Sequence, residues 1–325
     1  MIMDFTLILI YTENVRIFLH TKMSDPWSRR QIEIVSGLSA GFATTIITHP
    51  LDLIKVRLQL STSASSRPFD SLRNVISGIV QDARAARSAA ILQRPQIYYL
   101  FQQCYRGVGP NLVGNVSAWG LYFALYSEFK QFMPTADGTT KYFTASTLAG
   151  ISTSVLTNPI WVVKTRMLST SNRATHSYKS ALDGIRLIYH KEGIATFWRG
   201  TLPSLFSVFQ ASLHFTFYDH AKNYLMEKLN STSLSTLQYI YASVASKTLS
   251  MAIWYPTQVV RSRLQSYNFD GERRSLVLVI TQIYKNERGW RGFYRGLGAN
   301  IVRVLPSTII TFVSYETTKS YLSEA

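Results

Sequence analysis

Charged side chains recur inside otherwise apolar stretches of this sequence, where they are costly unless they meet water or each other. Asp52 and Lys55 are three residues apart and therefore share one face of a helix. Lys247 and Arg303 each lie in another long apolar segment. A base at such a position is a functional-site hypothesis by default, because its burial is expensive. These residues predict a water-accessible surface that pairs charges and binds an anion.

The sequence offers little support for catalysis or metal binding. It contains no glycine-rich phosphate loop of the GxxxxGK[ST] kind, and its six histidines do not have the spacing of metal ligands. The single cysteine, Cys104, excludes an internal disulfide framework and a cysteine-rich metal site, and we assign it no role. We therefore predict neither an enzyme nor a bound metal or cofactor.

The composition indicates amphipathic membrane helices with an anionic partner. Charged residues make up 16% of the chain and apolar and aromatic types 46%, whereas roughly a quarter of an average soluble domain is charged. The excess of Lys+Arg (34) over Asp+Glu (18) gives a net charge of +16. Such an excess fits an anionic solute, anionic lipid or nucleic acid. Basic residues near helix ends favour anionic lipid, with cardiolipin as one candidate, over nucleic acid.

Three sequence signatures each occur three times, in the same order. The first reads PLDLIKVR at 50–57, PIWVVKTR at 159–166 and PTQVVRSR at 256–263. The second ends in an arginine and a glycine, at Gly107, Gly200 and Gly296. The third reads YSEFK at 126–130, YDHAK at 218–222 and YETTK at 315–319. This repetition indicates three tandem units, each with two long helices.

We expect the long helices near residues 31–60, 108–132, 143–169, 201–224, 237–265 and 297–320. The charged loops between them, at 61–104, 170–196 and 266–292, have room for short helices, for example from Phe69 to Ala83. The spacing of Gly37 and Gly41 permits close helix contact in lipid. A soluble helical array is the competing interpretation, but units of about a hundred residues exceed the 20–50 residues of solenoid repeats.

With these signatures, the chain resembles the mitochondrial carrier family from about residue 30 to 322. The resemblance implies an all-α membrane protein: six transmembrane helices in three pseudo-symmetric repeats, with short matrix helices. Within the family the sequence looks most similar to FAD and folate carriers, because Trp161 and Gln258 replace the usual acids. Carriers for NAD and pyrimidine nucleotides share the tryptophan and remain alternatives.

A proline within a membrane helix removes a backbone hydrogen bond and bends the helix. We expect Pro50, Pro159 and Pro256 to bend three helices inward and close one end of a pathway. The family resemblance implies a ring of pairs there, which we call the matrix gate: Asp52 with Lys164, Trp161 with Arg261, and Gln258 with Lys55. The first is an ion pair, the second a cation–π contact and the third a hydrogen bond.

The resemblance also implies a second ring at the opposite mouth, which we call the cytosolic gate. There Asp219 is expected to pair with Lys319, and Glu316 with Lys130. Its third link lacks an acid, because Ser127 stands opposite Lys222 and Glu128 is about 100° further around the helix. With two ion pairs here and one in the matrix gate, we expect cytosolic closure to be relatively favoured.

The substrate is expected to be an anion with an aromatic part. The matrix gate has three bases and one acid, a surplus of two positive charges. We expect phosphates to bind Lys247 and Arg303, and a flat ring to stack on Trp119 or Tyr122. Trp119 facing lipid is the alternative, and His214 is expected to be a wall residue. The remaining expected substrate contacts are Asn115, Ser207 and Gln210.

These expectations define the protein as an FAD carrier of the mitochondrial inner membrane, working as a monomer by alternating access, as an antiporter or a uniporter. The peroxisomal membrane is an alternative location, and a non-transporting scaffold is an alternative of another class. The expected division is an N-terminal extension at 1–30 and repeats at 31–132, 143–224 and 237–322. Residues 1–22 lack the features of a secretory signal or transit peptide; they fit either an extension from a mis-set start or a disordered tail.

Overall fold

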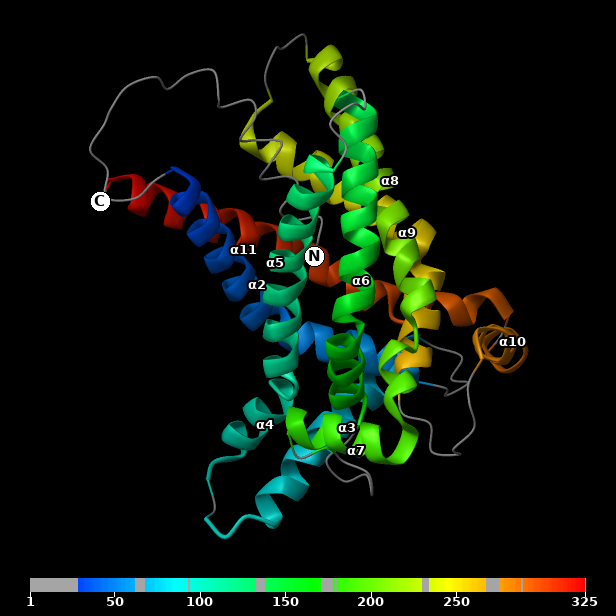
Figure 1. Cartoon of the computed structure of the whole chain (residues 1–325). Coiled ribbons are helices and arrows are strands. Elements are labelled where there is room, and N and C mark those ends of the chain that lie inside the picture. The colour runs from blue at the N-terminus through cyan, green and yellow to red at the C-terminus, as the bar shows by residue number, and fades with distance from the viewer. Residues whose placement is uncertain are drawn as a thin grey trace. The chain divides into compact units, whose positions relative to one another are not determined.

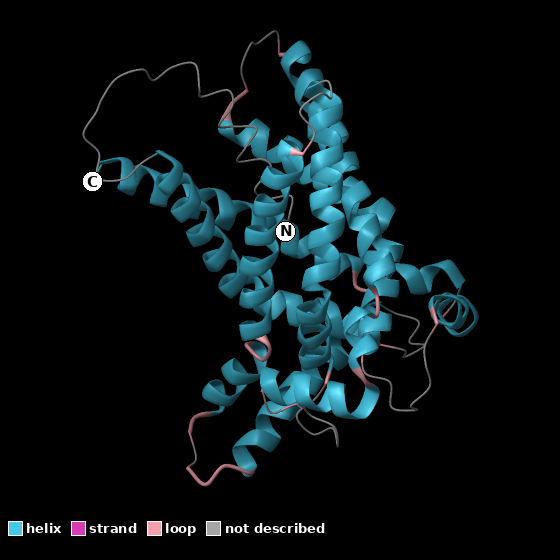
Figure 2. Cartoon of the chain, in the orientation of Figure 1, coloured by secondary structure: helices cyan, strands magenta, loops and turns pink. Residues whose placement is uncertain are grey.

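The structure is a computed structural model that describes residues 29–61, 68–92, 94–132, 138–170, 178, 180–229, 234–266, 275–287 and 289–324. All of residues 1–28 of the predicted N-terminal extension lie outside these ranges. Every described element is a helix, joined to the next by loops (Figure 2). The six long helices are labelled in Figure 1: α2 (Arg29–Leu60), α5 (Val108–Gln131), α6 (Gly138–Ser169), α8 (Thr201–Lys228), α9 (Thr236–Gln265) and α11 (Leu297–Glu324).

The predicted fold class is confirmed: long, short and long helices follow one another three times. The short elements are α3 (Pro68–Ser88), α4 (Gln96–Cys104), α7 (Ala181–Glu192), η1 (Ile194–Trp198), α10 (Leu276–Asn286) and η2 (Gly289–Tyr294). Helix α3 contains the segment expected at 69–83 and continues beyond it. Two helices begin at serine caps, where Ser180 accepts from the Asp183 amide and Ser275 from the Leu278 amide.

Polar residues interrupt most of the long helices. Among the described residues, two segments, Ile32–Leu60 and Gly289–Ser323, are long and apolar enough on their own to cross a membrane. Helices α2, α6 and α9 each continue through a proline, at Pro50, Pro159 and Pro256. Each proline lacks the N–H that would bond the preceding turn, so the helix is weakened at that point.

The chain divides into two compact units. The first contains residues 1–48, 211–250 and 302–325, and the second contains 49–210 and 251–301. Helices α5 and α6 belong wholly to the second unit, where they run side by side (Figure 1). In the same unit α6, α7 and η1 share an apolar core that includes Val162, Ile188 and Phe197.

In the first unit, hydroxyl groups join α2 to α11. Ser39 and Thr318 are 2.9 Å apart between their oxygens, and Thr44 and Thr311 are 2.7 Å apart. The spacing of Gly37 and Gly41 permits a close helix contact, but a Cβ added at Gly41 would meet no described atom within 4 Å. The two helices are therefore joined by hydrogen bonds between short polar side chains at these positions.

The glycine of each second signature begins a long helix in a left-handed conformation, with φ of 78° at Gly107, 79° at Gly200 and 80° at Gly296. A Cβ on Gly107 would lie 2.6 Å from Leu168, and one on Gly200 would lie 2.9 Å from Gln265. The backbone at each turn therefore touches the first helix of the following repeat. Glycine is required for both reasons, the positive φ and the close approach.

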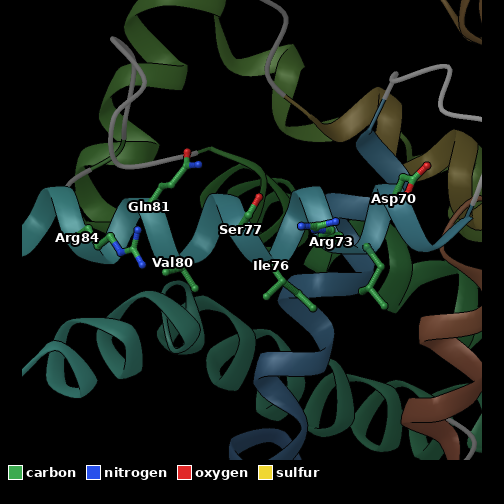
Figure 3. Close-up of a pocket in the computed structure, with 8 residues that line it drawn as sticks. Asp70, Arg73, Ile76, Ser77, Val80, Gln81 and Arg84 are labelled. Atoms are coloured by element: carbon green, nitrogen blue, oxygen red, sulfur yellow. The ribbon is translucent and has the colours of Figure 1, made fainter.

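A groove of about 670 Å³ follows successive turns of α3 (Figure 3). None of its lining residues is among the predicted gate or substrate-contact residues. They are Asp70, Leu72, Arg73, Ile76, Ser77, Val80, Gln81 and Arg84.

We predict that Gly200→Ala destabilises the protein by about 1–3 kcal/mol, because alanine is strained at a positive φ and its Cβ would press on Gln265. Thermal unfolding in detergent measures the change. Gly298→Ala is the matched control: its Cβ would meet no described atom within 4 Å, so its stability should stay the same or rise slightly. Equal effects of the two changes would contradict the packing argument.

Candidate functional site

The structure brings together all three pairs expected in the matrix gate, within the second unit. The Lys164 ammonium lies 3.9 Å from the Asp52 carboxylate, and both side chains are mostly buried. Lys55 donates a hydrogen bond of 3.2 Å to the side-chain oxygen of Gln258. The contacts connect α2 with α6 and α2 with α9. These two contacts therefore join the first helix of repeat one to the first helices of the other two repeats.

Trp161 provides the third contact of the matrix gate, between α6 and α9. The guanidinium carbon of Arg261 lies 5.9 Å from the centre of the Trp161 ring, and the Lys164 ammonium lies 5.0 Å from it. The indole N–H donates to Thr157 at 3.1 Å, which fixes the orientation of the ring. A Cβ on Gly114 would lie 3.2 Å from this indole. The small residue on α5 therefore makes room for the tryptophan.

One expected substrate contact is bonded directly to the matrix gate. The Gln258 amide nitrogen donates to the side-chain oxygen of Gln210 on α8, at 3.1 Å. Since Gln258 also accepts from Lys55, the two amides form a short chain of hydrogen bonds from α8 to α2. A ligand that engages the Gln210 amide oxygen would compete with Gln258 for it.

A second series of hydrogen bonds connects Asp52 to the turn before α5. Asn111 on α5 donates to Asp52 at 3.4 Å and lies 3.1 Å from His49 Nδ1. His49 Nε2 lies 3.0 Å from the Arg106 carbonyl, which can only accept, so His49 donates from Nε2 and accepts at Nδ1. His49 is fully buried. The chain therefore fixes the first helix of repeat one against the turn before α5.

Three arginines, the last residues of the first signature, join the repeats in a cycle; two are buried and Arg57 is mostly buried. Arg57 of repeat one donates from Nε to the carbonyl of Leu168 in repeat two at 3.2 Å. Arg166 of repeat two donates to the Gln265 carbonyl of repeat three at 3.1 Å. Arg263 closes the cycle by donating to the Gln59 carbonyl of repeat one at 2.7 Å. Each acceptor lies nine residues after the proline of its own repeat.

A carboxylate neutralises each of these arginines. Arg166 binds both oxygens of Glu192, one of them at 2.9 Å, and Arg263 lies 2.8 Å from Glu287. These two acids also bind the arginines of the second signature: Glu192 lies 3.1 Å from Arg199, and Glu287 lies 3.4 Å from Arg295. Charge-assisted pairs with two bonds are among the strongest polar contacts in proteins.

Repeat one has its own acid at this position, which the sequence analysis missed. Asp82 is almost fully buried and lies 3.4 Å from Arg57. It follows its proline by 32 residues, compared with 33 for Glu192 and 31 for Glu287. Equal spacing from the proline was the available signal. It was hidden because 24 residues separate Asp82 from Arg106, whereas 7 and 8 separate the corresponding pairs; the added residues extend α3 and form α4.

Arg106, in the turn between α4 and α5, links repeat one to repeat two. It donates to the Thr170 hydroxyl at 3.3 Å and to the Tyr178 carbonyl at 3.2 Å. Burial, with a smaller contribution from Arg57, lowers the pKa of Arg106 to about 10, and Asp82 acts in the opposite direction. The side chain stays protonated at neutral pH and adds a positive charge near Arg57 and Asp82.

The expected substrate contacts are divided between the two units. The second unit contains the expected contacts on α5 and α8, and the first contains buried Lys247 and half-buried Arg303. On α5, Trp119 stacks on Phe123 with 5.6 Å between ring centres, and Tyr122 stacks on Tyr126 with 6.2 Å. Within the second unit, the contacts are Asn115, Trp119, Tyr122, Ser207 and Gln210.

The cytosolic-gate residues are also divided: Lys130 lies in the second unit, and Asp219, Lys222, Glu316 and Lys319 lie in the first. Lys319 forms its ion pair with Glu33 on α2, at 3.0 Å, and its ammonium lies 5.4 Å from the centre of the Tyr315 ring. Asp219, its expected partner, is exposed on α8. The pairing rule overlooked Glu33 because this acid lies outside the three signatures. His214, which was predicted to be a wall residue, is buried.

Comparison with known proteins identifies a single family. Its sequence model, described as mitochondrial carrier protein, matches residues 28–85, 135–229 and 232–325. The three matched segments begin close to the starts of α2, α6 and α9. The first match ends just after Asp82, where the connection in repeat one becomes longer than in the other repeats.

Several curated proteins are similar over most of the chain. A mitochondrial FAD carrier protein of Saccharomyces cerevisiae is 35% identical over 321 residues, covering 91% of this chain and 98% of that protein. A mitochondrial nicotinamide adenine dinucleotide transporter of the same yeast is 33% identical, with 90% and 77% covered. A mitochondrial nicotinamide adenine dinucleotide transporter of Arabidopsis thaliana is 30% identical, with 86% and 77% covered.

We predict that Arg166→Lys lowers stability by about 2–4 kcal/mol. A lysine keeps the charge but cannot bind both oxygens of Glu192 and the Gln265 carbonyl together. Thermal unfolding in detergent measures the change. Arg186→Lys, an exposed position on α7, is the matched control and should change stability by less than about 0.5 kcal/mol. A comparably small effect at Arg166 would show that the cycle is not a main source of stability.

Proposed function

Because this chain belongs to the mitochondrial carrier family, whose members are multi-pass inner-membrane transporters rather than enzymes, we propose that it carries FAD across the mitochondrial inner membrane. The observation that carries this proposal is the similarity to the yeast FAD carrier, which extends over 98% of that protein. The coarser conclusion, a carrier of an anionic nucleotide cofactor, draws on the FAD and the nicotinamide adenine dinucleotide transporters together.

The charge of the pathway residues supports an anionic substrate. In the matrix gate Lys55, Lys164 and Arg261 face a single acid, Asp52, which leaves a surplus of two positive charges. FAD has two phosphates, so its charge complements this surplus. The buried ammonium of Lys247 adds a further base on the membrane helices. Bases at membrane depth are retained where they bind an anion or line its path.

The contacts of the matrix gate support an alternating-access cycle. With the three pairs formed, the matrix end is closed and a substrate can enter only from the cytosolic end. Transport requires these contacts to break after the substrate binds. One ion pair, one hydrogen bond and one cation–π contact are weaker together than three ion pairs would be, so less substrate-binding energy is needed to open them.

The hydrogen bond between Gln210 and Gln258 supplies a route from substrate binding to gate opening. A substrate that takes the Gln210 amide oxygen removes the acceptor of the Gln258 N–H. Gln258 then reorients, and its bond from Lys55 is lost or weakened. The Lys55 ammonium can then bind a phosphate in place of the Gln258 amide oxygen. Substrate binding and release of one gate contact are thus coupled through two neighbouring amides.

A second candidate substrate is NAD, because two of the similar transporters carry nicotinamide adenine dinucleotide. It shares the two phosphates and the adenine with FAD, so the bases would serve either cofactor. The difference lies in the second ring system, which the aromatic residues of α5 would contact. A non-transporting scaffold is the candidate of another class.

We predict saturable FAD uptake into liposomes that contain the purified protein. Unlabelled FAD should compete at least tenfold better than NAD, with FMN, folate and UTP behind. Protein-free liposomes serve as the control for leakage. If NAD competes better than FAD, the proposed substrate becomes NAD. If no nucleotide is taken up, the result supports a non-transporting scaffold.

We predict a coupling energy of about 1–2 kcal/mol between Asp52 and Lys164 in a double-mutant cycle of Asp52→Asn and Lys164→Gln, because the pair is mostly buried. Thermal unfolding of the four proteins in detergent gives this energy. Asp70→Asn, at an exposed position on α3, should add independently to Lys164→Gln. A coupling energy near zero would contradict the assignment of Asp52 and Lys164 as a gate pair.

A further inference from the structure

Glu33, near the start of α2, binds two residues of the third signature of repeat three. Its carboxylate lies 3.0 Å from the Lys319 ammonium and accepts a hydrogen bond from the Tyr315 hydroxyl. All three residues belong to the first unit, where the hydroxyl pairs Ser39–Thr318 and Thr44–Thr311 join the same two helices. Lys319, which was expected in the cytosolic gate, therefore forms its ion pair with an acid outside that gate.

The three repeats differ at this position. Glu33 precedes its proline by 17 residues, and the residues with the same spacing in the other repeats are Tyr142 and Tyr239. Tyr218, which corresponds to Tyr315, lies within electrostatic range of Tyr239. A neutral tyrosine cannot form an ion pair with a lysine at this end of the helices. Repeat one alone places a carboxylate there.

One ammonium cannot serve two separate carboxylates equally well. Asp219 on α8 is exposed, and no ion pair of Asp219 is present among the described residues. The Lys319–Glu33 pair is itself partly exposed, at 30% and 40% of the two side chains. A pair of this kind is weak enough to exchange partners within a transport cycle.

We propose that Glu33 is a positioning residue that holds Lys319 away from Asp219 while the cytosolic end is open. Closure of that end then requires Lys319 to leave Glu33 and pair with Asp219. The exchange places one ion pair in each state, so it lowers the bias toward cytosolic closure that two ring pairs would otherwise create. The inference rests on the proposed alternating-access cycle.

The test measures the ratio of cytosol-open to cytosol-closed protein. A reporter cysteine, Ser127→Cys in a Cys104→Ser background, is labelled with a membrane-impermeant maleimide in liposomes; Ser127 is exposed on α5. Glu33→Gln keeps an acceptor for Tyr315 but removes the charge, and should lower the open-to-closed ratio about two- to fivefold. Glu33→Tyr, which installs the residue of the other repeats, should act in the same direction.

Two comparisons make the result specific. Glu227→Gln removes an exposed acid near the end of α8 and should leave the ratio unchanged. In a Lys319→Gln background, Glu33→Gln should cause no further change, because the partner of Glu33 is already absent. An unchanged or increased ratio for Glu33→Gln, or the same decrease in the Lys319→Gln background, would overturn the inference.

FAD uptake by the unchanged protein is measured in parallel. Its absence would count against the proposed function, whereas the labelling ratio still reports whether Glu33 controls Lys319. Normal uptake by the unchanged protein, together with a ratio that does not respond to Glu33→Gln, would overturn the role of Glu33 alone.

Discussion

Three guanidinium groups hold α2, α6 and α9 together within the second unit, because each donates from one repeat to the main chain of the next. Arg57, Arg166 and Arg263 would be very costly to bury alone, and each therefore has a carboxylate of its own repeat beside it. The same carboxylates in repeats two and three bind the arginine that precedes the second long helix. In repeats two and three, these contacts therefore connect both long helices of the repeat with the first helix of the next repeat. The gate residues lie two and five residues earlier on the same helices, so these arginine contacts fix their positions.

The polar residues of the matrix gate are connected to further polar residues by hydrogen bonds. Asp52 is linked through Asn111 and His49 to the turn before α5, and Gln258 is linked to α8 through Gln210. Buried polar groups of this kind favour one arrangement strongly when all of them are bonded. Movement of α2, α6 or α9 therefore disturbs contacts on the other two. A cycle that opens one end can in this way involve all three repeats, even though each repeat supplies a different kind of gate contact.

Sequence reasoning predicted the fold well because its signals were repeated. The six long helices agree with expectation to within about five residues at each end, and the three side-chain pairs of the matrix gate are all present. What it missed lay outside the repeated signatures. Asp82 was hidden by the longer connection to Arg106, and Glu33 was hidden because the pairing rule considered only signature residues. The hydroxyl pairs that join α2 and α11 were not predicted either, because single serine and threonine residues in a helix give no repeated signal. Spacing from the prolines would have revealed Asp82, because the other two repeats have an acid at almost the same distance, but it gives no such signal for Glu33.

The mixed chemistry of the matrix gate affects how solution conditions act on it. Dissolved salt screens the attraction between Asp52 and Lys164, which are 14–16% exposed. It has much less effect on the hydrogen bond between Lys55 and Gln258 or on the indole face beside Arg261. Substitution of two acids by an amide and an indole therefore leaves only one of three contacts sensitive to ionic strength. The contacts among α2, α6 and α9 thus keep most of their strength as the ion content of the surrounding solution rises and falls.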